Sequence, residues 1–183
     1  MSARIPPIDE SRADAETRET LALIRREWGS SWNITNAMAT NPAVVAGFFA
    51  LWQAIERSGL TSTDREVICM EMAVQNGCHY CVPAHRYVAR EAGIDADLID
   101  RIARGETLDG DDRPAVLQRL VRALLATKGQ LSDQDFAGFR EAGITEAQMI
   151  AVVAEIAHCT LTNTFNRLAD TELDPFLQPL RLD

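Results

Sequence analysis

Residues 61–93 read TSTDREVICMEMAVQNGCHYCVPAHRYVAREAG, and this stretch decides the fold. Its first part, as far as Asn76, begins with hydroxyl side chains that cap helices and is apolar on most sides, which predicts a buried central helix. Gly77 ends that helix, and a second helix follows as far as Gly93, where another glycine allows the chain to turn. The stretch therefore predicts a helical hairpin at the centre of the molecule.

The second helix of the hairpin carries a cysteine pair near its beginning. Cys78 and Cys81 are three residues apart and His85 lies four residues beyond Cys81, so in a helix all three fall on about the same face. Pro83 has no backbone N–H, so we expect the regular helix to begin near Tyr80 or Cys81. The cysteines are thus predicted to lie at a helix N-terminus, with an imidazole one turn away.

This arrangement suits thiol chemistry. The thiolate is the reactive species, and both a helix N-terminus and a nearby imidazole lower the pKa of a cysteine from its ordinary value of about 8.5. A second thiol at hand can then close a disulfide. Two other interpretations are open: the three residues are ordinary core residues, or they bind zinc, although the motif lacks a second pair of ligands. Helix electrostatics favours Cys78 as the attacking thiol, whereas His85 favours Cys81.

Glu66 lies on the first helix of the hairpin and has two interpretations. Thr63 and Glu66 have the spacing of a capping box, in which the glutamate only satisfies a backbone N–H. If the two helices pack as a hairpin, Glu66 instead returns toward the cysteines as a general base or proton relay. Glu71, on the same apolar helix, competes for that role.

The remaining cysteines and histidines carry weaker signals. Cys69 and Cys159 lie in apolar helical runs, where free cysteine is usually a small hydrophobic residue, so both are predicted to be structural. His79 and His158 have no evident partner, and solvent exposure or a backbone hydrogen bond is expected for each. An aromatic group is predicted to belong to the core or to line a substrate pocket: Phe48, Phe49 and Trp52.

The rest of the chain also shows helical spacing, and no stretch alternates polar and apolar residues as a strand does. The sequence predicts a single all-α domain over residues 1–183, with an extended N-terminal arm (1–12) and an irregular C-terminal tail (171–183). Outside the hairpin, start and stop signals predict helices at about 13–28, 34–40, 42–58, 95–104, 112–128, 133–142 and 146–169.

Charge and hydropathy narrow the function classes. Eighteen basic and 27 acidic residues give a net charge of −9, so nucleic acid is not an expected partner. The longest apolar run, residues 43–52, is shorter than the roughly 18 residues of a membrane span, and the first ten residues lack a secretory signal, so we expect no membrane and a cytoplasmic location. In that reducing compartment, a close cysteine pair is more typical of catalysis than of a disulfide scaffold.

The motif resembles that of a known family. Arg65 and Glu66, followed after eleven residues by Cys78-His-Tyr-Cys-Val-Pro-Ala-His85, resemble the alkylhydroperoxidase AhpD-like branch of the carboxymuconolactone decarboxylase family. The resemblance is sharpest over about residues 61–105 and looser over residues 33–60. It implies an AhpD-like helical bundle whose central buried hairpin carries the CxxC pair.

The resemblance also implies a set of roles. Glu66, Cys78, Cys81 and His85 stand where the family has its proton-relay peroxidase site. By position, Cys81 is the peroxidatic cysteine and Cys78 the resolving one. Well-studied members place a histidine directly before the second cysteine, whereas this chain has Tyr80 there, which implies a simpler relay.

The expected function is therefore that of a thiol-dependent peroxidase or disulfide oxidoreductase that reduces alkyl hydroperoxides. Because the chain shows no flavin or nicotinamide fingerprint, an external protein dithiol or low-molecular-weight thiol is expected to reduce the disulfide, with no metal or organic cofactor. The resemblance implies a homo-oligomer, a trimer or hexamer. Two alternatives are a lactone decarboxylase, whose relatives generally lack the CxxC pair, and a non-catalytic redox-sensing module.

Overall fold

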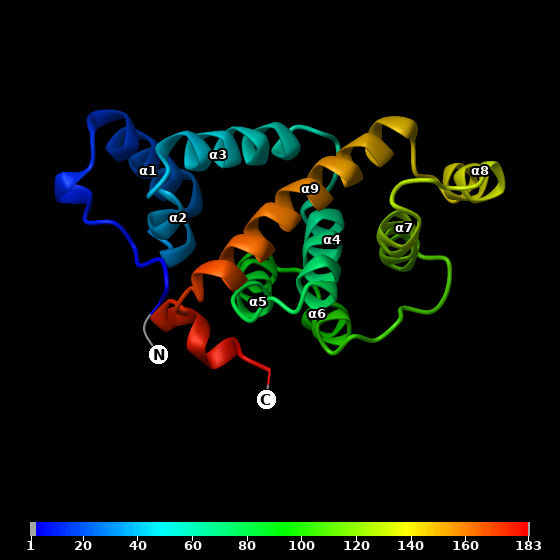
Figure 1. The fold of residues 1–183 in the computed structure, drawn as a ribbon. Helices are drawn as coiled ribbons and strands as arrows, with labels where there is room; N and C mark the ends of the chain where they lie inside the picture. Colours follow the sequence, from blue (N-terminus) through cyan, green and yellow to red (C-terminus); the bar gives the residue numbers. More distant parts are fainter. Residues whose placement is uncertain (1–2, 183) are drawn as a thin grey trace.

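The computed structural model describes residues 3–182, and within them the chain forms helices and no strand (Figure 1). The all-α prediction is confirmed, and the helices end close to their predicted bounds. In chain order they are α1 Ala15–Trp28, α2 Asn33–Met38, α3 Pro42–Glu56, α4 Ser62–Gln75, α5 Cys81–Glu91, α6 Ala96–Ala103, α7 Arg113–Thr127, α8 Asp133–Glu141 and α9 Glu146–Ala169. Two short 3-10 helices are η1 Glu10–Arg12 and η2 Pro175–Leu180.

Helix α4 forms the centre of the fold. It packs against α5, α6, α7 and α9, and Figure 1 shows the long α9 crossing it. Every residue from 66 to 73 is buried. The Thr61 hydroxyl accepts the N–H of Asp64 at 3.1 Å, and the Asp64 carboxylate accepts the N–H of Thr61 at 2.9 Å, a reciprocal cap that fixes where α4 begins. The central buried hairpin carrying the CxxC pair is confirmed.

The buried apolar side chains form two clusters that meet at the hairpin. One joins α4 with α6, α7 and α9, and it contains Cys69 and Cys159. The other joins α1, α2, α3 and the start of α5 with the C-terminal segment, and it contains Cys78 and Cys81. The four cysteines are therefore divided between the two halves of the core.

The C-terminal tail, predicted to be irregular, is instead partly helical. Residues 175–180 form η2, and its Leu177 is fully buried. Proline was expected to prevent regular structure here, but Pro175 occupies the first turn of a short 3-10 helix, where a backbone N–H is not needed. The Tyr80 hydroxyl donates to the Asp174 carboxylate at 2.5 Å, which ties the tail to the chain just before α5. Residue 183 lies outside the described residues.

The N-terminal arm, predicted to be extended, includes η1. The backbone N–H of Arg4 donates to the carbonyl of Ala169 at 2.7 Å, and that of Ile8 to Asn36 at 3.1 Å. These bonds hold the arm against the end of α9 and against α2. Residues 1 and 2 lie outside the described residues.

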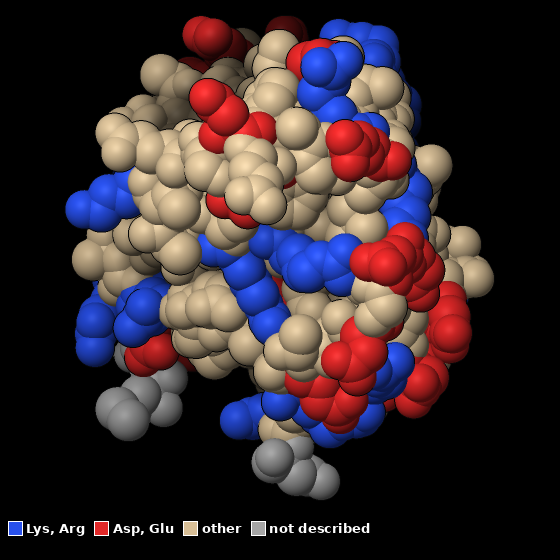
Figure 2. Space-filling view, turned by 90° about the vertical axis from the view of Figure 1, so that its right-hand side faces the viewer, with Lys and Arg blue, Asp and Glu red and all other residues tan. Residues whose placement is uncertain are grey.

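Two surface properties bear on partners. No single helix among the described residues is long and apolar enough to span a membrane; α8 and α9 pass that test only as a pair, which is bent by 107°. On the face shown in Figure 2, the basic side chains in the middle are flanked by acidic ones. This face therefore lacks the continuous basic surface that nucleic-acid binding uses.

Candidate active site

The cysteine pair lies at the turn between α4 and α5. Gly77 has a positive φ of 57°, which favours glycine, and this turn lets the N–H of Cys78 donate to the carbonyl of Ala73 at 2.9 Å. Cys81 is the first residue of α5, as predicted from Pro83. A disulfide joins Cys78 to Cys81, and the N–H of Cys81 donates to the Cys78 sulfur at 3.1 Å. An N–H at the helix start thus contacts sulfur directly, and it also lies 3.2 Å from the carbonyl oxygen of Cys78.

The Cys81 sulfur is held by two amides from α9. Asn163 Nδ2 donates to Cys81 Sγ at 3.1 Å and Asn166 Nδ2 at 3.4 Å, and both asparagines are fully buried. The Asn163 oxygen accepts from the amide of Asn76 at 2.9 Å, which turns its NH₂ group toward the sulfur. Hydrogen-bond donors favour the charged form of an acceptor, so these amides stabilise a thiolate at Cys81.

Glu66 and His85 form a pair beside this sulfur. His85 Nδ1 lies 2.9 Å from Glu66 Oε2. Burial lowers the pKa of His85, but the charge and hydrogen bond of Glu66 outweigh it and raise the pKa above its ordinary value. Since Thr61 and Asp64 cap α4, the alternative in which Glu66 serves in a capping box is wrong.

Glu71, the competing acid, has a structural role. It is fully buried, and Arg122 donates to both of its oxygens, at 2.6 and 3.1 Å. Gln118 donates to it as well, at 2.8 Å. Glu71 is therefore a partnered core acid, and it does not line the cavity next to Cys81.

A cavity of about 590 Å³ brings the site together. Cys81, His85 and Glu66 line one part of it. Its lining is also aromatic, with Trp28, Trp32, Phe48 and Trp52. Of the aromatic residues weighed from the sequence, Phe48 and Trp52 line the cavity, whereas Phe49 packs in the core. Cys81 therefore lines a cavity whose surface is largely apolar.

Cys78 faces a different space. A smaller depression of about 330 Å³ is lined by Cys78 together with Gly77, His79 and Pro83. Cys81 does not line this depression, and Cys78 does not line the larger cavity. The two sulfurs of one disulfide thus border separate spaces.

The two residues between the cysteines form hydrogen bonds with the C-terminal segment of the chain. The ring of His79 hydrogen-bonds through Nε2 to the carbonyl of Thr171 at 3.0 Å, which confirms the expected backbone bond. Burial, and then the charge of Asp174, raise the pKa of Tyr80 far above its ordinary value, so its phenol stays protonated as the donor to Asp174. Since both side chains are committed to the tail, neither takes part in the pair formed by His85 and Glu66.

Three further residues that line the cavity had sequence predictions that were wrong or incomplete. His158 is buried and stacks on Phe48, with ring centroids 4.7 Å apart, so it is neither exposed nor bonded to the backbone. Its predicted state failed because the aromatic partner comes from a distant helix. Cys69 and Cys159, predicted to be purely structural, also line this cavity.

The sequence analysis did not identify Asn163 and Asn166 as residues of the site. They stand three residues apart on one face of a long helix that is otherwise rich in apolar residues. Buried amides on such a face need partners. That pattern was the available signal, although it does not reveal which sulfur the amides contact.

The helices and the CxxC pair together define the class of protein, which is the AhpD-like helical fold. Three solved structures superpose on nearly the whole chain. The alkylhydroperoxidase AhpD core protein from Ralstonia eutropha JMP134, described as an uncharacterized peroxidase-related protein, is 23% identical, with a TM-score of 0.82, over 96% of this chain and 94% of that one. An uncharacterized peroxidase-related protein from Silicibacter sp. TM1040 is 19% identical, with a TM-score of 0.77, over 94% of each chain.

The third structure is a variant of the debrominase Bmp8 in complex with 2,3,4-tribromopyrrole. It is 17% identical, with a TM-score of 0.77, over 98% of this chain and 96% of that one. At these identities, all three likenesses are likenesses of fold.

A family model matches part of the chain. Residues 42–123, from the start of α3 into α7, match the model of the carboxymuconolactone decarboxylase family, which confirms the resemblance predicted from the CxxC motif. No curated protein matches the sequence.

Proposed function

We propose that the protein is a thiol-dependent peroxidase that reduces organic hydroperoxides through Cys81 and Cys78. The fold and family are those of peroxidase-related proteins and of decarboxylases. One observation carries the finer proposal: the Cys81 sulfur and the paired His85 and Glu66 border the same aromatic cavity. A nucleophile, a proton donor and an apolar binding surface are what reduction of an organic hydroperoxide requires.

The reaction begins with the reduced pair. The Cys81 thiolate attacks the terminal oxygen of the hydroperoxide, the O–O bond breaks, and a sulfenic acid forms on Cys81. The departing alkoxide takes a proton from the imidazolium of His85, a form that the raised pKa favours, and leaves as an alcohol. Glu66 holds the ring through Nδ1 and stabilises its charge. Cys78 then attacks the Cys81 sulfur, water leaves, and the disulfide forms.

The two spaces beside the disulfide suggest separate routes for the two substrates. The aromatic wall of the larger cavity favours a hydroperoxide with an alkyl or aryl group. Cys78 borders the smaller depression, so an external thiol attacks Cys78 from that side and releases Cys81 as thiolate. The reductant is a protein dithiol or a low-molecular-weight thiol. The cytoplasmic location and the homo-oligomer stay predictions.

The test is a thiol titration in the variant C69A/C159A, which keeps only the cysteines of the CxxC motif. The reduced variant is treated with one equivalent of cumene hydroperoxide, and both thiols are expected to be lost as one equivalent of cumyl alcohol appears. Steady-state consumption with dithiothreitol then separates an enzyme from a redox sensor, which would form the disulfide without turnover. Survival of both thiols would overturn the proposal.

The likeness to Bmp8 favours a second candidate, reductive removal of bromine from an aromatic ring, because this cavity also has aromatic walls. In that reaction the thiol pair supplies two electrons, bromide leaves, and a proton replaces it on the ring. Bromide release from 2,3,4-tribromopyrrole without consumption of cumene hydroperoxide would favour this candidate. Loss of CO₂ from a lactone acid with all thiols intact would instead favour the decarboxylase.

A further inference from the structure

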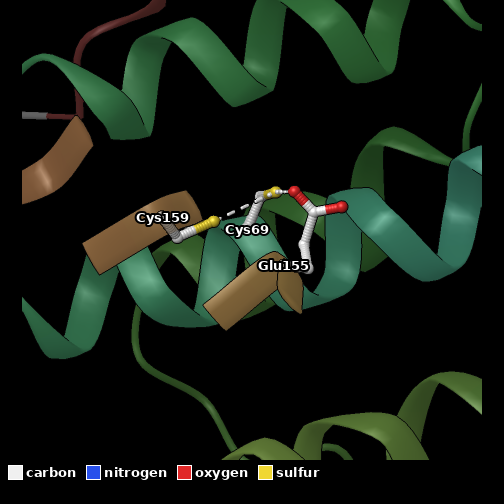
Figure 3. Close-up of side chains that lie close together, drawn as sticks. All are labelled: Cys69, Glu155 and Cys159. Carbon is white, nitrogen blue, oxygen red and sulfur yellow. Dashed lines mark hydrogen bonds between the residues drawn. The ribbon is translucent and has the colours of Figure 1, made fainter. Parts of the chain in front are cut away.

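A second pair of cysteines lies in the wall of the same cavity. Cys69 comes from α4 and Cys159 from α9, and their sulfurs are 3.3 Å apart (Figure 3). The side chain of Cys69 also lies within hydrogen-bond distance of Glu155, with its sulfur 3.4 Å from Oε1. Both cysteines are almost completely buried in the protein but line the cavity next to Cys81. Only a small molecule inside the cavity can reach them.

The charges around this pair favour a thiolate on Cys159. Arg65 donates to Glu155 Oε2 at 2.7 Å and neutralises that carboxylate. Burial lowers the pKa of His158, but its interactions with Cys159 and Glu155 outweigh burial and raise the pKa to about 9. Neither ring nitrogen of His158 makes a well-formed hydrogen bond to any described residue. Its Nδ1 lies 3.4 Å from Glu155 Oε1, so the imidazolium is paired with that carboxylate, and the same positive charge favours a thiolate on the adjacent Cys159.

The pKa of Cys159 follows the same logic. The hydrogen bond with Cys69 lowers it most, burial opposes this, and His158 lowers it further, to about 7. The pKa of Cys69 is raised by the same hydrogen bond and by burial. A cysteine whose pKa is lowered, in contact with a second thiol, supplies the two partners that peroxide oxidation to a disulfide requires.

We propose that Cys69 and Cys159 form a second redox pair, which the hydroperoxide bound in the cavity oxidises to a disulfide. This inference rests on the proposed function, since it uses the same substrate in the same cavity. It assigns Cys159 as the attacking residue and Cys69 as the resolving residue. The chain then stores four electrons for peroxide reduction, two in each pair.

The chemistry balances in two steps. The Cys159 thiolate attacks the terminal peroxide oxygen, the O–O bond breaks, and the alkoxide takes the proton of the His158 imidazolium to leave as alcohol. Cys159 is now a sulfenic acid. Cys69 attacks its sulfur, the S–S bond forms, and the hydroxyl leaves with the thiol proton as water. Two electrons pass from the sulfurs to the peroxide.

The same residues resemble a metal site, since ligand atoms of Cys69, Glu155 and Cys159 lie within 4.8 Å of one another. The charge balance favours the redox pair. Arg65 already neutralises Glu155, and a cation at this place would lie close to the Arg65 guanidinium and to a protonated His158. Bound zinc is therefore an outcome that contradicts the proposal.

The experiment uses the variant C78A/C81A, which retains only Cys69 and Cys159. After reduction and treatment with excess cumene hydroperoxide or hydrogen peroxide, both thiols are expected to be lost, and peptide mapping should find Cys69 linked to Cys159. Adding C69A to this variant should leave a sulfenic acid on Cys159 that dimedone traps. C78S/C81S is a second version in case the alanine variant is poorly folded, and circular dichroism compares each with the wild type.

The matched control is C69A/C159A, in which only the CxxC pair can react. If both thiols of C78A/C81A survive a peroxide that oxidises this control, the second pair is not redox-active and the proposal is overturned. Stoichiometric zinc in C78A/C81A that disappears with C69A also overturns it. If the control does not react but Cys69 and Cys159 close a disulfide, the proposed function fails at the CxxC pair and this inference stands.

Discussion

The two cysteine pairs differ in how the fold prepares each sulfur. Cys78 and Cys81 lie in one turn, and neutral groups hold their sulfurs: a helix N–H on Cys78 and two asparagine amides on Cys81. Cys69 and Cys159 come from two helices, and charged side chains surround them. Cys78 of the first pair also borders the smaller depression, from which the proposed route brings the reductant. We therefore propose that the first pair carries out steady-state turnover and that the second pair supplies two further electrons to peroxide.

Serine in place of each attacking cysteine should give the largest effect. Cys81→Ser removes the nucleophile of the pair that lies beside the proposed reductant route, so steady-state consumption of cumene hydroperoxide with a protein dithiol, which is too large to enter the cavity, should fall by about 10³-fold or more. Cys159→Ser should keep most of the wild-type rate. Equal losses in the two variants would remove the distinction between the pairs.

Two buried acids on α4 offer a matched comparison. Glu66→Gln weakens the charge stabilisation of His85, so kcat/KM should fall by about 10²-fold with little change in Tm. Glu71→Gln leaves Arg122 without its buried partner, so the free energy of unfolding should fall by about 3 kcal/mol while kcat/KM per folded molecule is kept. Thermal unfolding and steady-state kinetics on both variants check this. The opposite pattern would make Glu71 the functional acid.

The amides on Cys81 should have a smaller effect. Asn163→Ala removes one donor from a sulfur that must be a thiolate, which should raise the pKa of that thiol and lower the rate with cumene hydroperoxide about tenfold. Alkylation of Cys81 as a function of pH measures the shift. In C78A/C81A, the same Asn163→Ala change should leave the oxidation rate of Cys159 unchanged, because Asn163 contacts the first pair.

The smallest expected effect is a shift in a pH profile. In C78A/C81A, alkylation of Cys159 by iodoacetamide should be half-maximal near its pKa of about 7 and should slow as the pH falls below that value, because the thiolate is protonated. Adding His158→Gln removes the imidazolium and should move the midpoint to higher pH. A midpoint at the ordinary cysteine value in both proteins would mean that the second pair is not activated.

The sequence allowed the hairpin, the helix bounds and the CxxC pair to be predicted because their signals are local. Gly77 and Pro83 mark where α4 ends and α5 begins, and the spacing of Cys78, Cys81 and His85 lies within one short stretch. The return of Glu66 toward the cysteines was one of two interpretations, and it required the two helices to pack as a hairpin. These features depend on residues that are close along the chain.

The rest of the site depends on packing between distant helices. Asn163 reaches Cys81 across 82 positions, and Cys69 meets Cys159 across 90. Each lies in a helix whose apolar pattern predicts burial but not its partner. The prediction that His158 is exposed or bonded to the backbone was wrong. Its stacking partner Phe48 belongs to α3, which is distant along the chain, so the sequence around His158 gives no sign of it.

The central claim is that Cys81 is the residue that attacks the hydroperoxide, and trapping its sulfenic acid tests this most directly. Reduced protein that carries Cys78→Ser together with C69A and C159A is treated with one equivalent of cumene hydroperoxide in the presence of dimedone, and the labelled residue is located by peptide mapping. The account predicts dimedone on Cys81. Consumption of the hydroperoxide with Cys81 still a free thiol would contradict it.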